Sequence, residues 1–323
     1  MFHSLEPRSG EKCRPTSQRR LLFLLSVLAA LCVLSCGNSP KKRAPEAHNL
    51  LDGSLPPRFV SLSPGVTETL IALGARASLV GISDYCLLES EPQTSLQKMG
   101  SAITPNYERI AHARPTQILM SQISGDQLLH LNKIAPTTSL PWLTLKEWSD
   151  SVVRLGVIVN EQDKATALSS RIVQALDRTP EAKAPRILFA LDYGDSGSNE
   201  VWFIRKNSIH GAALRAAGGK NAVARDIMGQ PKLSPEQLLS LNPDAIIILR
   251  SAQPEKKRET QSLAFYKKWQ PLSAVKNSRL AVLSVPGALT IGPNILDLVP
   301  QIRATIDKLF KASPLTQPQG SPK

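Results

Sequence analysis

Short apolar runs alternate with helical patterns along most of the chain. Residues 58–62 form one such run, and residues 64–73 then carry apolar side chains at helical spacing before Gly74. A second apolar run, 79–82, follows directly. Strands that alternate with helices in this way are typical of parallel sheets with helices on both faces. We therefore expect an α/β fold.

One helix-to-strand pattern occurs twice, 128 residues apart. Glu108 lies at the start of a short helical segment that stops before Pro115 and leads into an apolar strand, and Glu236 does the same before Pro243. Solenoid repeats have much shorter periods, of roughly 20 to 50 residues. The pattern instead predicts two similar Rossmann-like lobes with a ligand cleft between them, each lobe presenting one carboxylate at an equivalent position.

A helical spacer is expected between the lobes. Thr144 and Glu147 have the spacing of a capping box, and apolar residues recur at helical intervals through 165–175. We expect this spacer to act as a single long backbone helix. The second lobe then begins with the apolar strand 186–191 and ends with a helix over about 294–310.

Both ends of the chain are expected to lie outside the lobes. Arginines, the apolar run 21–34 and a small-residue exit are typical of a signal peptide, and the apolar run is shorter than the roughly 20 residues that span a bilayer. Proline-rich polar stretches follow the leader and close the chain. The expected divisions are a signal peptide (1–35), a tether (36–57), the N-terminal lobe (58–143), the helical spacer (144–184), the C-terminal lobe (185–312) and a disordered tail (313–323).

Cys36 is the candidate for a lipid anchor. The run from Val33 to Cys36 resembles the lipobox of bacterial lipoproteins, in which the cysteine is acylated and becomes the first residue of the mature chain. Cys86 would then be the remaining thiol, so no intrachain disulfide is expected. The alternative is an ordinary signal peptide, cleaved or retained, with Cys36 unmodified.

The formal net charge of +13 is compatible with nucleic acid, an anionic membrane or an anionic ligand. Export argues against nucleic acid. The charges are also dispersed, apart from 41–43 in the tether and 256–258, which we expect in a loop. Most of them are therefore interpreted as a solvated surface.

Candidate ligand-binding residues lie where the predicted strands end, because ligands of open α/β sheets bind at the carboxyl ends of the strands. Aromatic rings would stack on a large planar or catecholate ligand, and an arginine would neutralise an anionic one. Trp202, together with Phe203, is equally compatible with a place in the core. The candidates are Ser63, Tyr85, Tyr193, Trp202 and Arg205.

Five segments, in order, resemble the substrate-binding proteins of ABC importers for cobalamin and iron-siderophore complexes, whose lobes are joined by a rigid helix. They are Arg58 to Glu68, Val80 to Tyr85, Pro105 to Ile110, Ala217 to Asn221 and Leu233 to Leu238.

The resemblance implies a non-enzymatic lipoprotein on the periplasmic or outer face of a bacterial membrane. It would capture a metal chelate (an iron-siderophore, haem or a corrinoid such as cobalamin), with no cofactor or metal site of its own. Its partner would be an ABC permease dimer with ATPase subunits, and Glu108 and Glu236 would pair with permease arginines. Tyr85 matches a cleft tyrosine of the cobalamin-binding members, which carry tryptophans where this chain has Ala102 and Gln230.

Parts of the sequence also bear on three other functions. The run from Gly194 to Gly197 resembles the nucleophile loop of chymotrypsin-like proteases, with His112, His130 or His210 as the base, but that family is all-β. A receptor for bare zinc or manganese would need several histidines and carboxylates at one place. A lipoprotein could also keep this fold in a structural or sensory role without a transporter.

Overall fold

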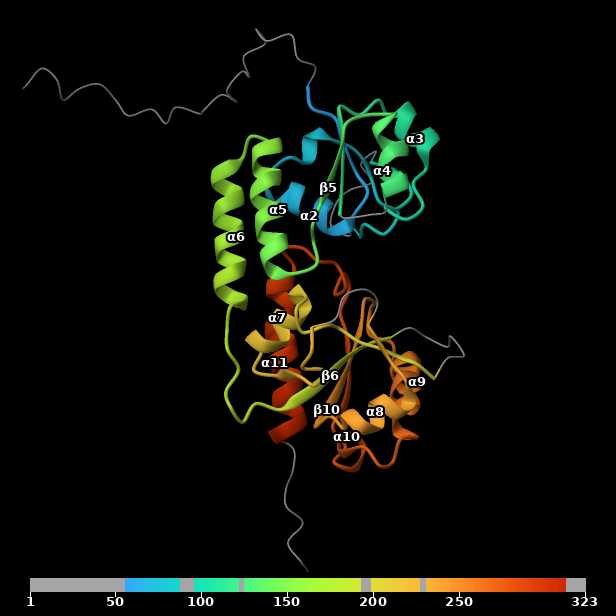
Figure 1. The fold of residues 1–323 in the computed structure, drawn as a ribbon, viewed down its shortest axis with the longest axis vertical. Helices are drawn as coiled ribbons and strands as arrows, with labels where there is room; N and C mark the ends of the chain where they lie inside the picture. Colours follow the sequence, from blue (N-terminus) through green and yellow to red (C-terminus); the bar gives the residue numbers. More distant parts are fainter. Residues whose placement is uncertain (1–55, 88–95, 122–124, 193–198, 227–230, 312–323) are drawn as a thin grey trace, which may run out of the picture. The chain divides into compact units, whose positions relative to one another are not determined.

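The computed structural model describes residues 56–87, 96–121, 125–192, 199–226 and 231–311 (Figure 1). The predicted leader with the tether up to residue 55, including Cys36, and the predicted tail lie outside these residues. So do Tyr193, the run Gly194 to Gly197, and Gln230. None of the described helices is long and apolar enough to cross a membrane.

The first sheet is parallel throughout, in the order β3-β2-β1-β4-β5. Its strands are short, and the central strand β1 is fully buried. The strands are β1 (Phe59–Ser61), β2 (Leu79–Ile82), β3 (Gln97–Lys98), β4 (Gln117–Ser121) and β5 (Thr137–Leu140). The helices of this lobe are α2 (Pro64–Ala72), the 3-10 turn Arg76–Ser78, α3 (Tyr107–His112) and α4 (Gly125–Asn132).

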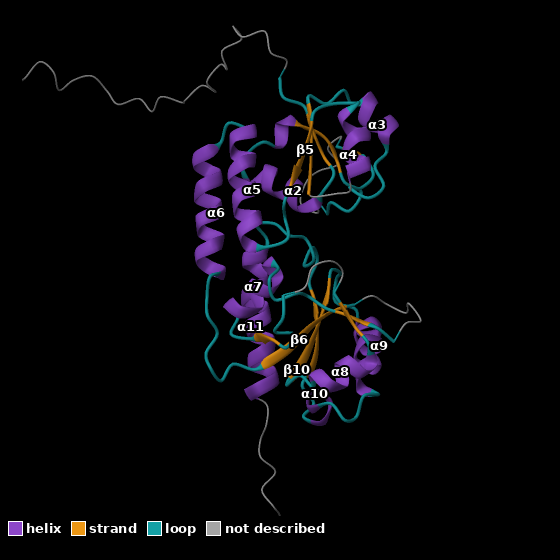
Figure 2. Cartoon of the chain, viewed as in Figure 1, coloured by secondary structure: helices purple, strands orange, loops and turns teal. Residues whose placement is uncertain are grey.

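The second sheet is also parallel, in the order β11-β10-β6-β8 (Figure 2). Its strands are β6 (Arg186–Leu191), β8 (Lys220–Asn221), β10 (Ala245–Arg250) and β11 (Leu280–Ser284), and β7 (Val201–Trp202) and β9 (Lys232–Leu233) form a separate antiparallel pair. The helices are α7 (Ile209–Ala216), α8 (Pro235–Leu241), α9 (Lys256–Lys267), α10 (Ser273–Lys276) and α11 (Ile295–Lys311). The basic run 256–258 opens α9, so its expected place in a loop was wrong.

The expected α/β class with two parallel sheets is confirmed, but the linking segment is not a single long helix. Two helices of similar length, α5 (Leu145–Ile158) and α6 (Gln162–Leu176), are joined by a tight turn at Asn160, whose φ is 57°. A left-handed residue reverses the chain, so that α6 packs back along α5.

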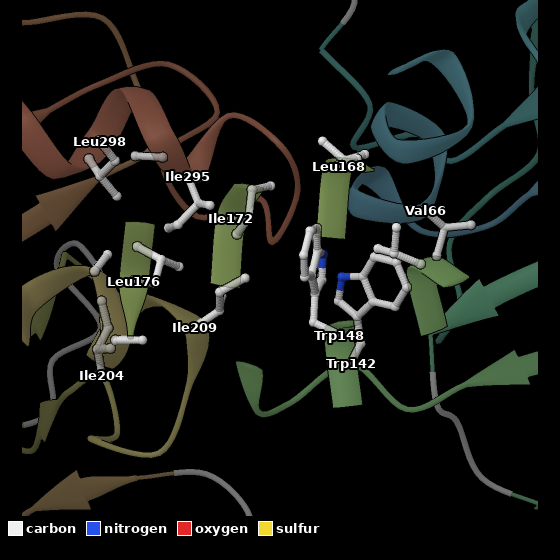
Figure 3. Packing of buried hydrophobic residues seen from close by; sticks show 14 of the residues in the cluster. Val66, Trp142, Trp148, Leu168, Ile172, Leu176, Ile204, Ile209, Ile295 and Leu298 are labelled. Carbon is white, nitrogen blue, oxygen red and sulfur yellow. The ribbon is translucent and has the colours of Figure 1, made fainter. Parts of the chain in front are cut away.

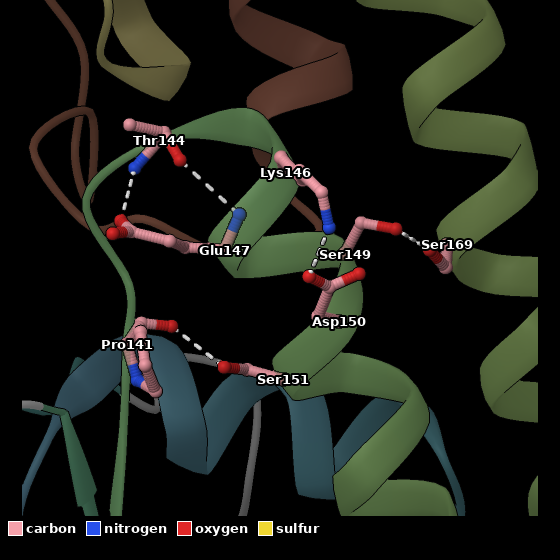
Figure 4. Close-up of polar contacts among 8 residues, drawn as sticks. All are labelled: Pro141, Thr144, Lys146, Glu147, Ser149, Asp150, Ser151 and Ser169. Atoms are coloured by element: carbon pink, nitrogen blue, oxygen red, sulfur yellow. Dashed lines mark hydrogen bonds and ion pairs between the residues drawn. The ribbon is translucent and has the colours of Figure 1, made fainter.

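Small side chains and caps explain why these two helices pair. A Cβ on Gly156 would lie 2.3 Å from the Cβ of Ala165, so only glycine allows this approach. Ser149 and Ser169 join the two helices through a 2.7 Å hydrogen bond between their hydroxyls (Figure 4). The predicted capping box is confirmed, since Thr144 Oγ1 accepts from the Glu147 amide and Glu147 Oε2 accepts from the Thr144 amide.

One continuous apolar cluster includes residues of both lobes and of the helical pair (Figure 3). Trp148 on α5 and Ile172 on α6 are fully buried within it. Burial of apolar surface stabilises a fold by about 25 cal/mol per Å². The helical pair is therefore part of the hydrophobic core rather than an exposed linker.

The loop between β11 and α11 also joins elements of both lobes. Trp142, just after β5, donates its Nε1 hydrogen to the carbonyl of Ile291 at 2.7 Å. A Cβ on Gly65 of α2 would lie only 2.0 Å from the same carbonyl oxygen. The backbone of this segment therefore packs against α2.

Candidate functional site

Ser63 and Ser121 meet at the carboxyl edge of the first sheet. Their hydroxyl oxygens are 2.8 Å apart, and the Ser121 amide donates to Ser63 Oγ at 2.9 Å. Ser63 precedes α2, yet its side chain does not cap that helix because it bonds to Ser121. Ser63 is buried, so its main contact is structural: it ties the end of β4 to the start of α2.

Tyr85 stands out from the loop that follows β2, with 71% of its surface exposed. The loop itself is held in place, because the Asp84 amide donates to the Gly100 carbonyl and the Gly100 amide donates to Asp84 Oδ1. The neighbouring loop carries Ile103, which is 78% exposed. A fixed loop that presents an exposed ring offers a surface on which a planar ligand can stack.

Trp202 and Phe203 have different environments. Phe203 is fully buried and belongs to the core of the second lobe, whereas Trp202 is half-buried in β7 and pairs across the strands with Lys232. The interpretation as a core residue is therefore confirmed for Phe203. Trp202 remains a candidate for ligand contact.

Arg205 is half-buried near the first turn of α5. Burial lowers the pKa of its guanidinium, and the carboxylate of Glu147 acts in the opposite direction. Glu147 Oε2 in turn accepts hydrogen bonds from two backbone amides, those of Leu143 and Thr144. Arg205 therefore lies beside an anchored carboxylate.

The carboxyl edge of the second sheet holds a polar network that the sequence analysis missed. Arg250, the last residue of β10, forms a 2.7 Å ion pair from Nε to Asp192 Oδ2, just after β6. Ser284, at the end of β11, donates to Glu259 Oε1 at 2.8 Å and lies 3.4 Å from Arg250 Nη1. The signal available in the sequence was the presence of polar residues at the ends of apolar strands. Their pairing could not be predicted from it, because the pairs join segments that are far apart in sequence.

Glu108 and Glu236 are exposed residues in the first turns of α3 and α8, as predicted. Ser234 donates to Glu236 Oε2 at 2.6 Å, and this hydrogen bond lowers the pKa of the Glu236 carboxyl. Both glutamates are therefore accessible to a partner, and each lies in the first turn of the repeated helix of its lobe.

The match between the two copies extends to their hydrogen bonds. Arg58 donates Nη2 to the carbonyl of Ala113 at 2.7 Å, and Arg186 donates Nη2 to that of Leu241 at 2.8 Å. The offset of 128 residues is the same for both the donors and the acceptors.

The copies also share their turns and strand register. A left-handed residue follows each helix: Arg114, two residues after the end of α3, with φ 46°, and Asn242, directly after α8, with φ 39°. In the strands, Phe59 pairs with Gln117 and Ile187 pairs with Ala245, again at the same offset. The internal repeat seen in the sequence is thus a repeat of geometry, and the two glutamates occupy equivalent places in it.

The histidines are dispersed. His210 is buried with Nε2 2.7 Å from the Ala288 carbonyl oxygen, and burial lowers the pKa of its imidazole. His112 contacts the Glu108 carbonyl within its own helix, and His130 lies against Tyr107. Within the described ranges there is no cluster of three or more potential metal ligands.

Comparison with known proteins gives the family. The model of the family described as "Periplasmic binding protein" matches residues 59–285, which covers most of the chain. This chain belongs to the periplasmic binding protein family.

Related periplasmic binding proteins show how far the similarity extends. The "Vitamin B12-binding protein" of Salmonella typhimurium is 26% identical over 203 residues, covering 61% of this chain and 73% of that protein. Among solved structures, a periplasmic heme binding protein from Pseudomonas aeruginosa superimposes with a TM-score of 0.62 at 22% identity, over 80% of this chain and 94% of that chain. The siderophore binding protein BauB gives a TM-score of 0.61 at 22% identity, over 78% and 93% respectively.

These structures share the fold with the present chain. The family consists of binding proteins, so the expectation of a non-enzymatic protein is confirmed.

Proposed function

We propose that this periplasmic binding protein is the substrate-binding lipoprotein of an ABC importer, capturing an iron-siderophore, haem or corrinoid and delivering it to a permease. The ligand would lie in a cleft between the carboxyl edges of the two sheets, against Tyr85 and Trp202, with Tyr193, Arg205 and the loop of Ser63 around it. The relatives named above bind ligands of these three kinds.

The observation that carries the proposal is the geometric repeat. A permease built from two like subunits presents the same surface twice, and a receptor with two equivalent halves offers it two equivalent contacts. Glu108 and Glu236 are exposed at equivalent positions, where an arginine of each permease subunit would pair with them. Exposed ion pairs contribute about 0 to 1 kcal/mol each, so they set orientation and encounter rate rather than affinity.

The decisive experiment separates docking from capture. The double variant Glu108→Gln/Glu236→Gln should lower uptake by about tenfold or more while leaving chelate binding by the purified protein unchanged. The matched control, Asp150→Asn/Asp163→Asn, removes two exposed carboxylates from α5 and α6 and should leave uptake unchanged.

Equal uptake by both double variants would contradict the docking role. It would favour the alternative in which the fold serves a structural or sensory lipoprotein without a transporter.

A further inference from the structure

The two repeated helices carry different charges around their equivalent glutamates. Three exposed basic residues of the first copy have neutral polar counterparts in the second: Arg109 corresponds to Gln237, His112 to Ser240 and Arg114 to Asn242. Over the equivalent segments 105–116 and 233–244, the formal charge is +1 in the first copy (two arginines and Glu108) and −2 in the second (Glu236 and Asp244). The match between the two backbones therefore does not extend to the charge that each copy shows to a partner.

The basic residues of the first copy contact neutral groups rather than carboxylates. Arg109 donates Nη1 to a backbone carbonyl at 3.2 Å, and His112 Nδ1 lies 3.1 Å from the backbone carbonyl oxygen of Glu108. Arg114 is exposed just beyond the end of the helix. A partner that approaches α3 therefore meets two arginines and a histidine around one carboxylate, a surface that favours a partner with an acidic side chain of its own.

The two surfaces also differ in shape. An open hollow of about 540 Å³ lies beside the first glutamate, lined by Glu108, Ala111, His112 and Arg114. The second copy has Leu239 at the position of Ala111, and 36% of the surface of this larger apolar residue is exposed. Leu239 follows Glu236 by three residues, so the two side chains share one face of α8. The first copy thus offers a recess beside its glutamate, and the second offers an apolar projection.

We propose that the permease partner of this receptor is built from two different subunits, or two different halves of one chain, so that the receptor docks in a single orientation. The inference rests on the proposed function, in which Glu108 and Glu236 dock. The subunit at α3 carries a carboxylate and a bulky side chain beside its arginine, and the subunit at α8 carries an apolar recess. The reverse orientation brings the acidic second copy against that carboxylate and leaves the hollow unfilled, and both effects oppose binding.

Site-directed cross-linking tests which permease subunit lies against each copy. Ala111→Cys and Leu239→Cys each place a thiol beside one glutamate, whereas the native Cys86 is buried. Each variant is labelled with benzophenone maleimide, bound to membrane vesicles of the bacterium that makes it and irradiated, and the cross-linked permease peptides are identified by mass spectrometry. We expect the two positions to label different subunits, or different halves, each with at least about tenfold preference. Arg171→Cys, on the exposed face of α6, is the control and should label neither.

A variant with two matching copies tests the cause. The first copy receives the residues of the second through the substitutions Arg109→Gln, Ala111→Leu, His112→Ser and Arg114→Asn. The two docking orientations then become equivalent, so the label at Leu239→Cys should spread over both subunits to within about twofold. Arg154→Gln/Arg171→Gln removes the same amount of charge from exposed positions of α5 and α6, and should keep the preference. Thermal melts of both variants verify folding.

Labelling of one and the same subunit from both positions, or of both subunits equally from each, would overturn the inference while leaving the proposed function standing. A preference that survives in the variant with matching copies would do the same, because the orientation would then be set elsewhere. Labelling of no permease from either position would overturn the proposed function, and the inference with it.

Discussion

Glu68 on α2 is a carboxylic acid placed where water has limited access. A Cβ on Gly292, in the loop before α11, would lie 2.6 Å from Glu68 Oε2 and 3.4 Å from Asn294 Oδ1, so both oxygens flank the same point. Asn294 Oδ1 is buried without a hydrogen-bond partner among the described residues. Burial raises the pKa of the Glu68 carboxyl to about 7 from its ordinary value of 4.5. A protonated Glu68 can donate a hydrogen bond to such an acceptor.

Stability should therefore depend on pH through Glu68. The folded state holds the proton more strongly than the unfolded state, so this contribution is complete below about pH 4.5 and is lost as pH rises through about 7. Glu68→Gln, neutral at every pH, should match the unmodified protein near pH 5 and exceed its stability at pH 8 by about 1 kcal/mol, allowing for the partial exposure of the group. Urea unfolding at both values measures the difference.

Glu181→Gln serves as the control because Glu181 is exposed. It should leave the pH profile unchanged. If Glu68→Gln gave the same profile as this control, the carboxyl would be solvated in the folded state, contrary to its packing against Gly292.

Single residues were predictable where their role is local. The helix starts at Glu108 and Glu236 followed from spacing alone, and both were confirmed. The burial of Phe203 and the pairing of Asp192 with Arg250 were not predictable, because each depends on strands that are distant in sequence meeting in one sheet. A pattern of polar and apolar residues shows which face of a helix or strand is buried, but not which other segment packs against that face.

At the scale of elements, the repeated helix and strand are held together by an arginine at the start of the neighbouring strand: Arg58 directly precedes β1, and Arg186 is the first residue of β6. Arg58 and Arg186 each donate to carbonyls at the end of the repeated helix, which have no acceptor role within the helix itself. We call this set of hydrogen bonds the clasp. It also includes a bond from the Arg58 amide to Thr116 Oγ1 in the first copy and one from the Arg186 amide to Asp244 Oδ2 in the second. In both copies the clasp joins the end of the repeated helix to the start of a neighbouring strand.

Removal of either arginine should loosen its own helix. Arg58→Met and Arg186→Met retain the aliphatic stem but lose the hydrogen bonds, and each should lower the free energy of unfolding by about 1 kcal/mol, since these bonds lie near solvent. Hydrogen exchange should accelerate in α3 for the first variant and in α8 for the second. Arg171→Met, on the exposed face of α6, is the matched control and should change neither. Unchanged exchange in both repeated helices would show that the clasp is not needed to hold them.

Elements were predictable in proportion to their length. The start of α5 at its capping box and the final helix α11, expected over about 294–310, were found within a residue of their observed bounds. The two-residue strands β7, β8 and β9 were missed because a period cannot be recognised in two residues. The reversal between α5 and α6 was also missed, since Asn160 is left-handed without being a glycine.

On the scale of the whole molecule, the two lobes share more than a linker. The helical pair α5 and α6 contributes buried residues to the common core, and Trp142 and Gly65 hold the Ile291 backbone at a second contact. Large closing motions would have to break both sets of contacts. Under the proposed function, this arrangement would hold the proposed docking residues Glu108 and Glu236 at a nearly constant separation, whether or not cargo is bound.

Attachment to the membrane through Cys36 is the remaining prediction at this scale. Acyl chains bind a bilayer in proportion to their buried methylene groups, about 0.8 kcal/mol each, and stable anchoring takes more than one chain. Cys36→Ser should therefore abolish incorporation of labelled fatty acid and move the protein from the membrane pellet to the supernatant. Cys86→Ser is the matched control, because Cys86 is buried, its thiol donates to Thr67 Oγ1 at 3.3 Å, and burial raises its pKa. It should stay labelled and membrane-bound. A Cys36→Ser protein that still sedimented with membranes would point to an uncleaved leader as the anchor.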